Sequence, residues 1–97
     1  MEGERTLRVH VHGRVQGVAF RAYACETARH LGLRGWVRNH RTGRTVELLI
    51  AGPAGEVERF VRWLHDGPPL ADVERVDVAE EAPDDVPAGR FEIARSV

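Results

Sequence analysis

The apolar residues of this chain switch between two repeat periods, and this pattern limits the fold more than any other feature of the sequence. Leu7, Val9 and Val11 alternate with polar residues, which is typical of a half-buried β-strand. Apolar residues within 20–31 and 57–64 recur instead every three or four positions, which predicts two amphipathic helices. Further strands are predicted, between breaks that contain glycine or proline, at 33–39, 45–51 and 73–78.

This order of elements, β-α-β-β-α-β, predicts an α+β fold of the ferredoxin-like sandwich type. Right-handed crossovers would place both helices on one face of an antiparallel sheet. A short segment at 90–94 is a candidate for a fifth strand at the sheet edge. No repeat or linker interrupts the pattern, so residues 1–97 are expected to form a single domain. Because this fold hosts enzymes, ligand sensors and RNA-binding modules, the function has to be inferred from the site.

The composition excludes several kinds of chemistry. All 14 basic residues are arginine, so Schiff-base formation and the lysine-containing phosphate loop of nucleotide triphosphatases are impossible. Cys25 is the single cysteine and cannot form an internal disulfide, and its place in a predicted helix indicates a buried structural thiol. The sequence has no apolar run of membrane-spanning length and no signal peptide at its start, so a cytoplasmic protein that does not associate with membranes is expected.

The charges are distributed unevenly along the chain. Residues 1–50 contain nine arginines against four acidic residues, whereas residues 51–97 contain five arginines against eleven acidic residues. The net charge of −1 argues against a protein that coats nucleic acid. Either the two halves cancel on the folded surface, or the first half contains a site for an anion.

The connection between the first predicted strand and the first helix, Gly13–Arg21, has the features of such a site. Gly13 and Gly17 let the backbone adopt positive φ and turn its N–H groups inward, which suits a phosphate-sized anion at a helix N-terminus. Arg21 places a cation in the first turn of the helix, where the macrodipole disfavours it by roughly 0.3–1 kcal/mol, and a bound anion would remove this conflict. The alternatives are a tight turn without a ligand, and an Arg21 side chain that points to solvent or to a surface carboxylate.

Two segments of the chain carry a resemblance to a known family. Gly13-Arg14-Val15-Gln16-Gly17-Val18-Ala19-Phe20-Arg21 resembles the signature loop of the acylphosphatases, and Gly35-Trp36-Val37-Arg38-Asn39 resembles their second signature. The similarity continues through Val46-Glu47, the helix at 60–64 and the closing Phe91-Glu92-Ile93, so it covers nearly the whole chain.

The resemblance implies an enzyme that hydrolyses acyl phosphates to a carboxylate and inorganic phosphate without a metal or cofactor. It implies that Arg21 binds the phosphoryl group and that Asn39 orients the attacking water. The backbone amides that would share the phosphate with Arg21 belong to Val15, Gln16, Gly17, Val18, Ala19 and Phe20. These groups are chemically sufficient, because phosphoryl transfer needs mainly positioning and charge stabilisation, and an acyl phosphate already has a good leaving group.

The sequence also departs from the family pattern after the second signature. His40 follows Asn39 where the family commonly has a small hydroxyl residue, and the connection 41–45 is one residue longer than usual. We expect a β-bulge to absorb the extra residue, since a bulge accommodates one unpaired position locally. Without the motif, Asn39 itself would be interpreted as a residue that bonds the local backbone at a strand end.

Other candidate sites are weaker. His10 and His12 point to one face of a strand, but no third ligand with recognisable spacing follows, so a surface pair is favoured over a metal site. The acidic pairs Glu80-Glu81 and Asp84-Asp85 lie in connecting sequence without the spacing of a calcium loop, and a solvated loop is favoured. No metal ligands are therefore predicted.

Three alternative functions remain at this point. An RNA-binding module of this fold needs aromatic residues on the central strands, and the strands at 7–11 and 45–51 contain none. A non-catalytic phosphate or metabolite sensor would use the same loop and Arg21 without turnover. A stand-alone relative of the acylphosphatase-like domain in larger carbamoyl-transfer proteins is disfavoured by the short chain. The expected partners are an acyl phosphate and inorganic phosphate, with no nucleic acid, and the protein is expected to be a monomer.

Overall fold

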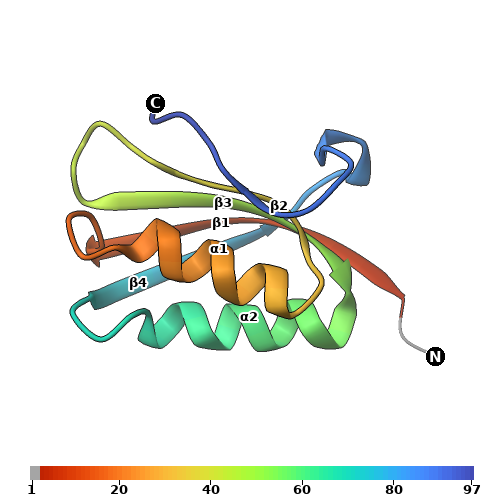
Figure 1. Cartoon of the computed structure of the whole chain (residues 1–97), viewed down its shortest axis with the longest axis horizontal. Coiled ribbons are helices and arrows are strands. Elements are labelled where there is room, and N and C mark those ends of the chain that lie inside the picture. Colours follow the sequence, from red (N-terminus) through yellow and green to blue (C-terminus); the bar gives the residue numbers. More distant parts are fainter. Residues whose placement is uncertain (1–2) are drawn as a thin grey trace.

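The computed structural model describes residues 3–97 as two layers, a five-stranded β-sheet and a pair of helices on one of its faces (Figure 1). The predicted order of elements is confirmed, including the fifth strand. The elements follow one another as β1 (Glu4–Arg14), α1 (Phe20–His30), β2 (Arg34–Asn39), β3 (Thr45–Pro53), α2 (Ala54–Asp66), β4 (Asp72–Glu80), a short 3₁₀ helix (Pro83–Asp85) and β5 (Glu92–Ile93). No helix within the described residues is long and apolar enough to cross a membrane.

The strands lie side by side in the order β4-β1-β3-β2-β5. The four long strands pair antiparallel, as predicted. The short fifth strand, β5, for which the sequence predicted no direction, runs parallel to β2, so the sheet as a whole is mixed. β4 lies at the opposite edge, and the connection at 81–91 carries the chain across to β2. A hairpin turn would impose an antiparallel pair, whereas a long crossing connection leaves the strand direction free.

The core lies between the helices and the sheet. Leu7, Val9 and Val11 of β1 are buried there with the large side chains of Phe20 and Phe60, so the period-two pattern of this strand is confirmed. The alternate β1 residues project from the opposite face, which no helix of residues 3–97 covers (Figure 1). We call this the open face of the sheet.

The two tryptophans have different environments. Trp63 of α2 packs against Phe20 and Phe60, with ring centroids 5.9 Å from each. Trp36 of β2 is instead covered by the guanidinium of Arg38, which lies 4.4 Å from its ring centroid. Neither ring is therefore presented as a bare platform for a nucleobase, which agrees with the weakness of the RNA-binding alternative.

Candidate active site

A cavity of about 260 Å³ lies where the end of β1 leads into α1. It is lined by Val15, Gln16, Gly17, Ala19, Phe20, Arg21, Ala22, Asn39 and Ile93. The structure thus brings the predicted loop and Asn39 to one place, with the exception of Val18, whose side chain packs into the core. Ile93 was not predicted as a site residue. It reaches the cavity because β5 pairs with β2, and its side chain is half exposed.

The loop that forms the cavity depends on residues with positive φ. Gly13 has a φ of 134°, and a Cβ there would lie 2.3 Å from the carbonyl oxygen of Asp72, so only glycine fits where β1 and β4 approach. Gly17 has a φ of 74° with open space around it, so its backbone conformation alone favours glycine. Ala19, with a φ of 58°, is the only non-glycine residue with positive φ in 3–97. Backbone strain of this kind concentrates at functional sites.

The N-terminus of α1 leaves its first amides available. Ala19 occupies the N-cap position and its side chain makes no capping hydrogen bond, and no acidic residue lies in the first turn. The first hydrogen bond into the helix runs from the amide of Tyr23 to the carbonyl of Ala19, so the amides of Phe20, Arg21 and Ala22 have no acceptor within the helix. All three residues line the cavity. The positive end of the helix dipole is therefore directed at an uncapped site.

The two side chains predicted to act on the substrate have no partner in the protein. Within residues 3–97, the guanidinium of Arg21 makes no ion pair or hydrogen bond, and the side-chain amide of Asn39 makes no hydrogen bond. Both are partly exposed and both line the cavity. The alternative in which Arg21 pairs with a surface carboxylate is therefore wrong. Asn39 does not bond the local backbone through its side chain either.

Gln16 has a structural role that the sequence did not reveal. Its side-chain Nε2 donates to the carbonyl oxygens of His40 at 2.7 Å and Thr45 at 2.9 Å. These two carbonyls lie at the two ends of the turn that joins β2 to β3, and this turn begins directly after Asn39. Gln16 therefore ties the loop that surrounds the cavity to the segment that holds Asn39.

Gln16→Ala is expected to lower the free energy of unfolding by about 1–2 kcal/mol, because two hydrogen bonds at roughly 0.5–1.5 kcal/mol each are lost. If the cavity is an active site, turnover should fall by roughly tenfold or more, since small displacements of positioned groups are costly. Urea unfolding and steady-state kinetics would measure the two effects. Unchanged stability and unchanged turnover together would show that the tether is not needed.

The hairpin accommodates its length differently from the prediction. The β2–β3 ladder keeps one register from Arg34↔Ala51 to Asn39↔Val46, so no bulge interrupts it. The turn after the ladder is closed instead by the amide of Gly43, which donates to the carbonyl of His40 at 3.2 Å. Gly43 has a φ of 85°, which glycine adopts without strain. Asn39 is therefore held in the strand as the partner of Val46.

His40 takes part in a charged network on the open face, centred on Glu47. The carboxylate of Glu47 accepts hydrogen bonds from His40 Nε2 at 2.8 Å, from Arg38 at 2.9 and 3.0 Å and from Arg8 at 2.5 Å. Its side chain is only 5% exposed. Burial alone would raise its pKa, but the hydrogen bonds from His40, Arg8 and Arg38 outweigh burial and hold the pKa of Glu47 at about 2. Burial lowers the pKa of the neighbouring His10.

Acid is expected to destabilise the protein through Glu47. The pKa of this group is 4.5 for an unperturbed glutamate and about 2 in the folded chain, so its stabilising effect is fully present above about pH 4.5 and is lost as the pH falls through about 2. The difference corresponds to roughly 3 kcal/mol. Urea unfolding in metal-free buffer across this pH range would measure this change in the free energy of unfolding.

Glu47→Gln should flatten the dependence of the free energy of unfolding on pH. Glu26→Gln, which replaces an exposed carboxylate on α1, is the charge control. A pH dependence of Glu47→Gln as steep as that of the parent would contradict the assignment.

The remaining sequence candidates are largely structural. Cys25 is buried, and its thiol lies 3.5 Å from the carbonyl oxygen of Phe91, as expected for a structural cysteine. Glu80 and Glu81 form ion pairs with Arg5 and Arg8. The acidic segment 80–85 forms no cluster of metal ligands within the described residues.

The fold and the cavity together define a small ferredoxin-like α+β protein with an arginine at an uncapped helix N-terminus. The family model described as Acylphosphatase matches residues 7–93. An acylphosphatase of Azoarcus sp. (strain BH72) is 53% identical over 81 residues, which cover 84% of this chain and 80% of that protein. The chain belongs to the acylphosphatase family.

Solved structures agree with this assignment. An acylphosphatase from Coxiella burnetii superposes with a TM-score of 0.84 at 35% identity, covering 94% of this chain and 93% of that chain. The acylphosphatase of Bacillus subtilis superposes with a TM-score of 0.85 at 36% identity, and the match covers 92% of this chain and 97% of that chain. The similarity therefore extends over nearly all of this chain and nearly all of each of the two solved chains.

Proposed function

We propose that this chain hydrolyses the carboxyl–phosphate bond of acyl phosphates and releases a carboxylate and inorganic phosphate. Membership of the acylphosphatase family supports the reaction and the substrate class. One observation carries the assignment of residues: Arg21 and Asn39 line the same cavity as the first amides of α1, and neither side chain has a partner within residues 3–97.

Arg21 and the amides of 15–20 bind the phosphoryl group. The guanidinium offers a planar set of donors that matches two phosphate oxygens, and the amides at the helix N-terminus add donors and a favourable dipole. As the bond to the carboxylate oxygen breaks, charge on the phosphoryl oxygens is stabilised by donors that are already in position. This arrangement requires no cofactor, and no metal takes part in the reaction.

Asn39 orients the attacking water. An amide cannot remove a proton near neutral pH, but its carbonyl oxygen can accept a hydrogen bond from water and aim a lone pair at phosphorus. Arg21 is the only ionisable residue that lines the cavity among the described residues, so the proton of the water passes to the phosphate of the substrate. A sharp inflection of the pH–rate profile near neutrality that disappears on replacement of one histidine would overturn this step.

The remaining expectations concern the state of the protein. We propose that it acts as a monomer in the cytoplasm, with the acyl phosphate and inorganic phosphate as its partners and without nucleic acid. The packing of Trp63 and the covering of Trp36 by Arg38 support the last point. Sedimentation of the purified protein at several concentrations would test the monomer.

The test of the function is a hydrolysis assay with an aryl acyl phosphate in buffer that contains a chelator. The parent should consume the substrate much faster than spontaneous hydrolysis, and both Arg21→Ala and Asn39→Ala should lose nearly all of this activity. A parent without turnover that is still stabilised against heat by inorganic phosphate would identify a phosphate-binding relative instead, and would reject the enzyme.

A further inference from the structure

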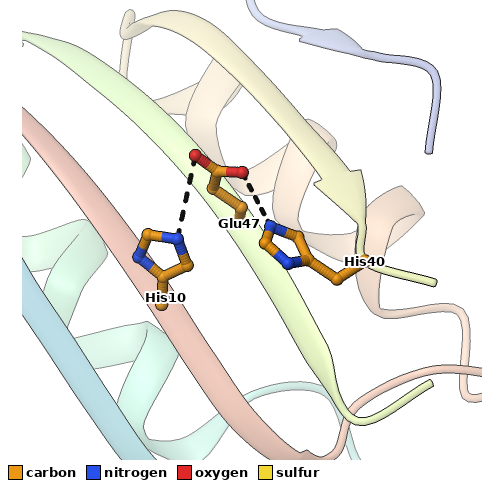
Figure 2. Close-up of side chains that lie close together, drawn as sticks. All are labelled: His10, His40 and Glu47. Atoms are coloured by element: carbon orange, nitrogen blue, oxygen red, sulfur yellow. Dashed lines mark hydrogen bonds and ion pairs between the residues drawn. The ribbon is translucent and has the colours of Figure 1, made fainter. Parts of the chain in front are cut away.

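We propose that the open face of the sheet carries a binding site for a divalent transition-metal ion of the zinc class, formed by His10, His40 and Glu47. The three residues come from β1, from the start of the turn after β2 and from β3. Figure 2 shows the carboxylate of Glu47 between the two imidazole rings. His10 and Glu47 do not line the cavity, so this site is separate from the proposed reaction and does not depend on it.

The pairing of the strands creates the cluster. His10 and Glu47 are direct partners in the β1–β3 ladder, and Arg38 is the partner of Glu47 on the other side, in β2. His40 follows two positions after Arg38, on the same face of the sheet. The sequence pattern indicated only His10 and His12 as possible ligands. It could not indicate His40 and Glu47, because they are far from His10 in the chain and come close to it only when the strands pair.

The distances are close to those that a metal ion needs. One ligand atom from each residue lies within 4.8 Å of the others. His40 Nε2 is 2.8 Å from Glu47 Oε1, and His10 Nε2 is 3.8 Å from Glu47 Oε2. Two ligands at about 2.0–2.1 Å from a tetrahedral ion are about 3.3–3.4 Å apart. The two distances end on different oxygens of the carboxylate, so the three side chains must rotate to bring one ligand atom of each to this spacing. His40 must then present Nε2 without the hydrogen that it donates to Glu47 here.

The local charge permits a cation. Arg8 and Arg38 both donate to Glu47, and these guanidinium groups are the natural competitors of a metal ion. Arg8 is also paired with Glu81 at 2.7 Å, so the two arginines are balanced by two carboxylates and the formal charge of the cluster is zero when the imidazoles are neutral. In this arrangement the arginines would act as outer partners that orient the ligating carboxylate.

The donor set selects the class of ion. Two imidazoles and one carboxylate suit zinc and its neighbours among the transition metals, whereas magnesium and calcium prefer sites built from oxygen alone. His10 and His40 are 33% and 27% exposed, so an ion has access from solvent and keeps a position for water.

His12 is close to the site but engaged elsewhere. Its ring stacks on that of His10 at 6.4 Å between centroids. Its Nδ1 lies 3.0 Å from Thr45 Oγ1 and its Nε2 lies 2.9 Å from Asp77, so both ring nitrogens have partners. His12 is therefore the control that separates this site from a simple chelate of the two histidines of β1.

The experiment is calorimetric titration of the full chain, without an affinity tag, with zinc chloride near neutral pH. One zinc ion per chain is expected, and His10→Ala and His40→Ala should each weaken binding by about a hundredfold or more, since even outer partners of metal ligands are worth 10–100-fold. His12→Ala and His65→Ala, which replaces an exposed histidine on α2, should change the affinity by less than about threefold. Magnesium should not bind at the same concentration.

Two results would overturn the proposal. Absence of binding at about 100 µM zinc would mean that the guanidinium groups retain the carboxylate. Binding that is weakened by His10→Ala and His12→Ala but not by His40→Ala would place the ion on β1 alone. Far-ultraviolet circular dichroism of each variant would establish that it is folded, and the partly exposed positions of His10 and His40 make these substitutions milder than one at the buried Glu47.

Discussion

Arg21→Lys is expected to lower kcat/KM for an acyl phosphate by at least about a hundredfold, although the positive charge is kept. Lysine offers a compact point charge in place of a planar set of donors, and it cannot hold two phosphoryl oxygens in one orientation. Arg21→Ala should cost more, roughly a thousandfold, which corresponds to about 4 kcal/mol of transition-state stabilisation. Because Arg21 has no partner within residues 3–97, its removal should leave the free energy of unfolding nearly unchanged.

The control is Arg14, which lies at the end of β1, is exposed and does not line the cavity. Arg14→Lys and Arg14→Ala make the same changes of chemistry and charge at a neighbouring position, and we expect them to retain turnover within about threefold. Inhibition by inorganic phosphate should weaken in the Arg21 variants alone. Near-normal turnover of Arg21→Lys would contradict the proposed role of this residue.

Asn39→Ala is expected to reduce kcat by roughly a hundredfold to a thousandfold while inorganic phosphate still binds. The side chain is proposed to act on the water and not on the phosphate, so the inhibition constant of phosphate should stay within about twofold of the parent value. The backbone of Asn39 is held independently of its side chain, since its carbonyl accepts from the amide of Val97 at 3.0 Å. The substitution should therefore leave the strand in place.

A loss of kcat without a loss of phosphate affinity is the result that would assign Asn39 to the attacking water. Steady-state kinetics and phosphate inhibition, measured on the same preparation, give both numbers. Thr42→Ala, in the exposed turn of the same hairpin, controls for a general loosening of this segment. Parallel losses of turnover and phosphate affinity in Asn39→Ala would show that it binds phosphate, and would overturn its assignment to the water.

Most of the architecture follows from local patterns. The alternation at Leu7, Val9 and Val11 and the three-and-four spacing from Phe20 are consequences of strand and helix geometry. The structure buries the three strand residues and, in the helix, Phe20, Ala24 and Ala28, whereas Thr27 and Leu31 are only partly buried. The loop from Gly13 could be predicted for the same reason, because positive φ is a property of single residues. The direction of β5 could not be predicted, since the chain reaches this strand through a long connection and not through a turn of defined type.

The sequence by itself determined the order of elements, the positive φ at Gly13 and Gly17 in the loop before α1, and the identity of Arg21 and Asn39 as candidates. Only the tertiary structure placed Ile93 at the cavity, tied Gln16 to both ends of the hairpin, and brought His10 and His40 to the carboxylate of Glu47. The physical reason is that hydrophobic period and backbone preference act over a few neighbouring residues, whereas contacts between side chains of different strands depend on how the strands pair. Residues far apart in the chain become neighbours only once that pairing is set.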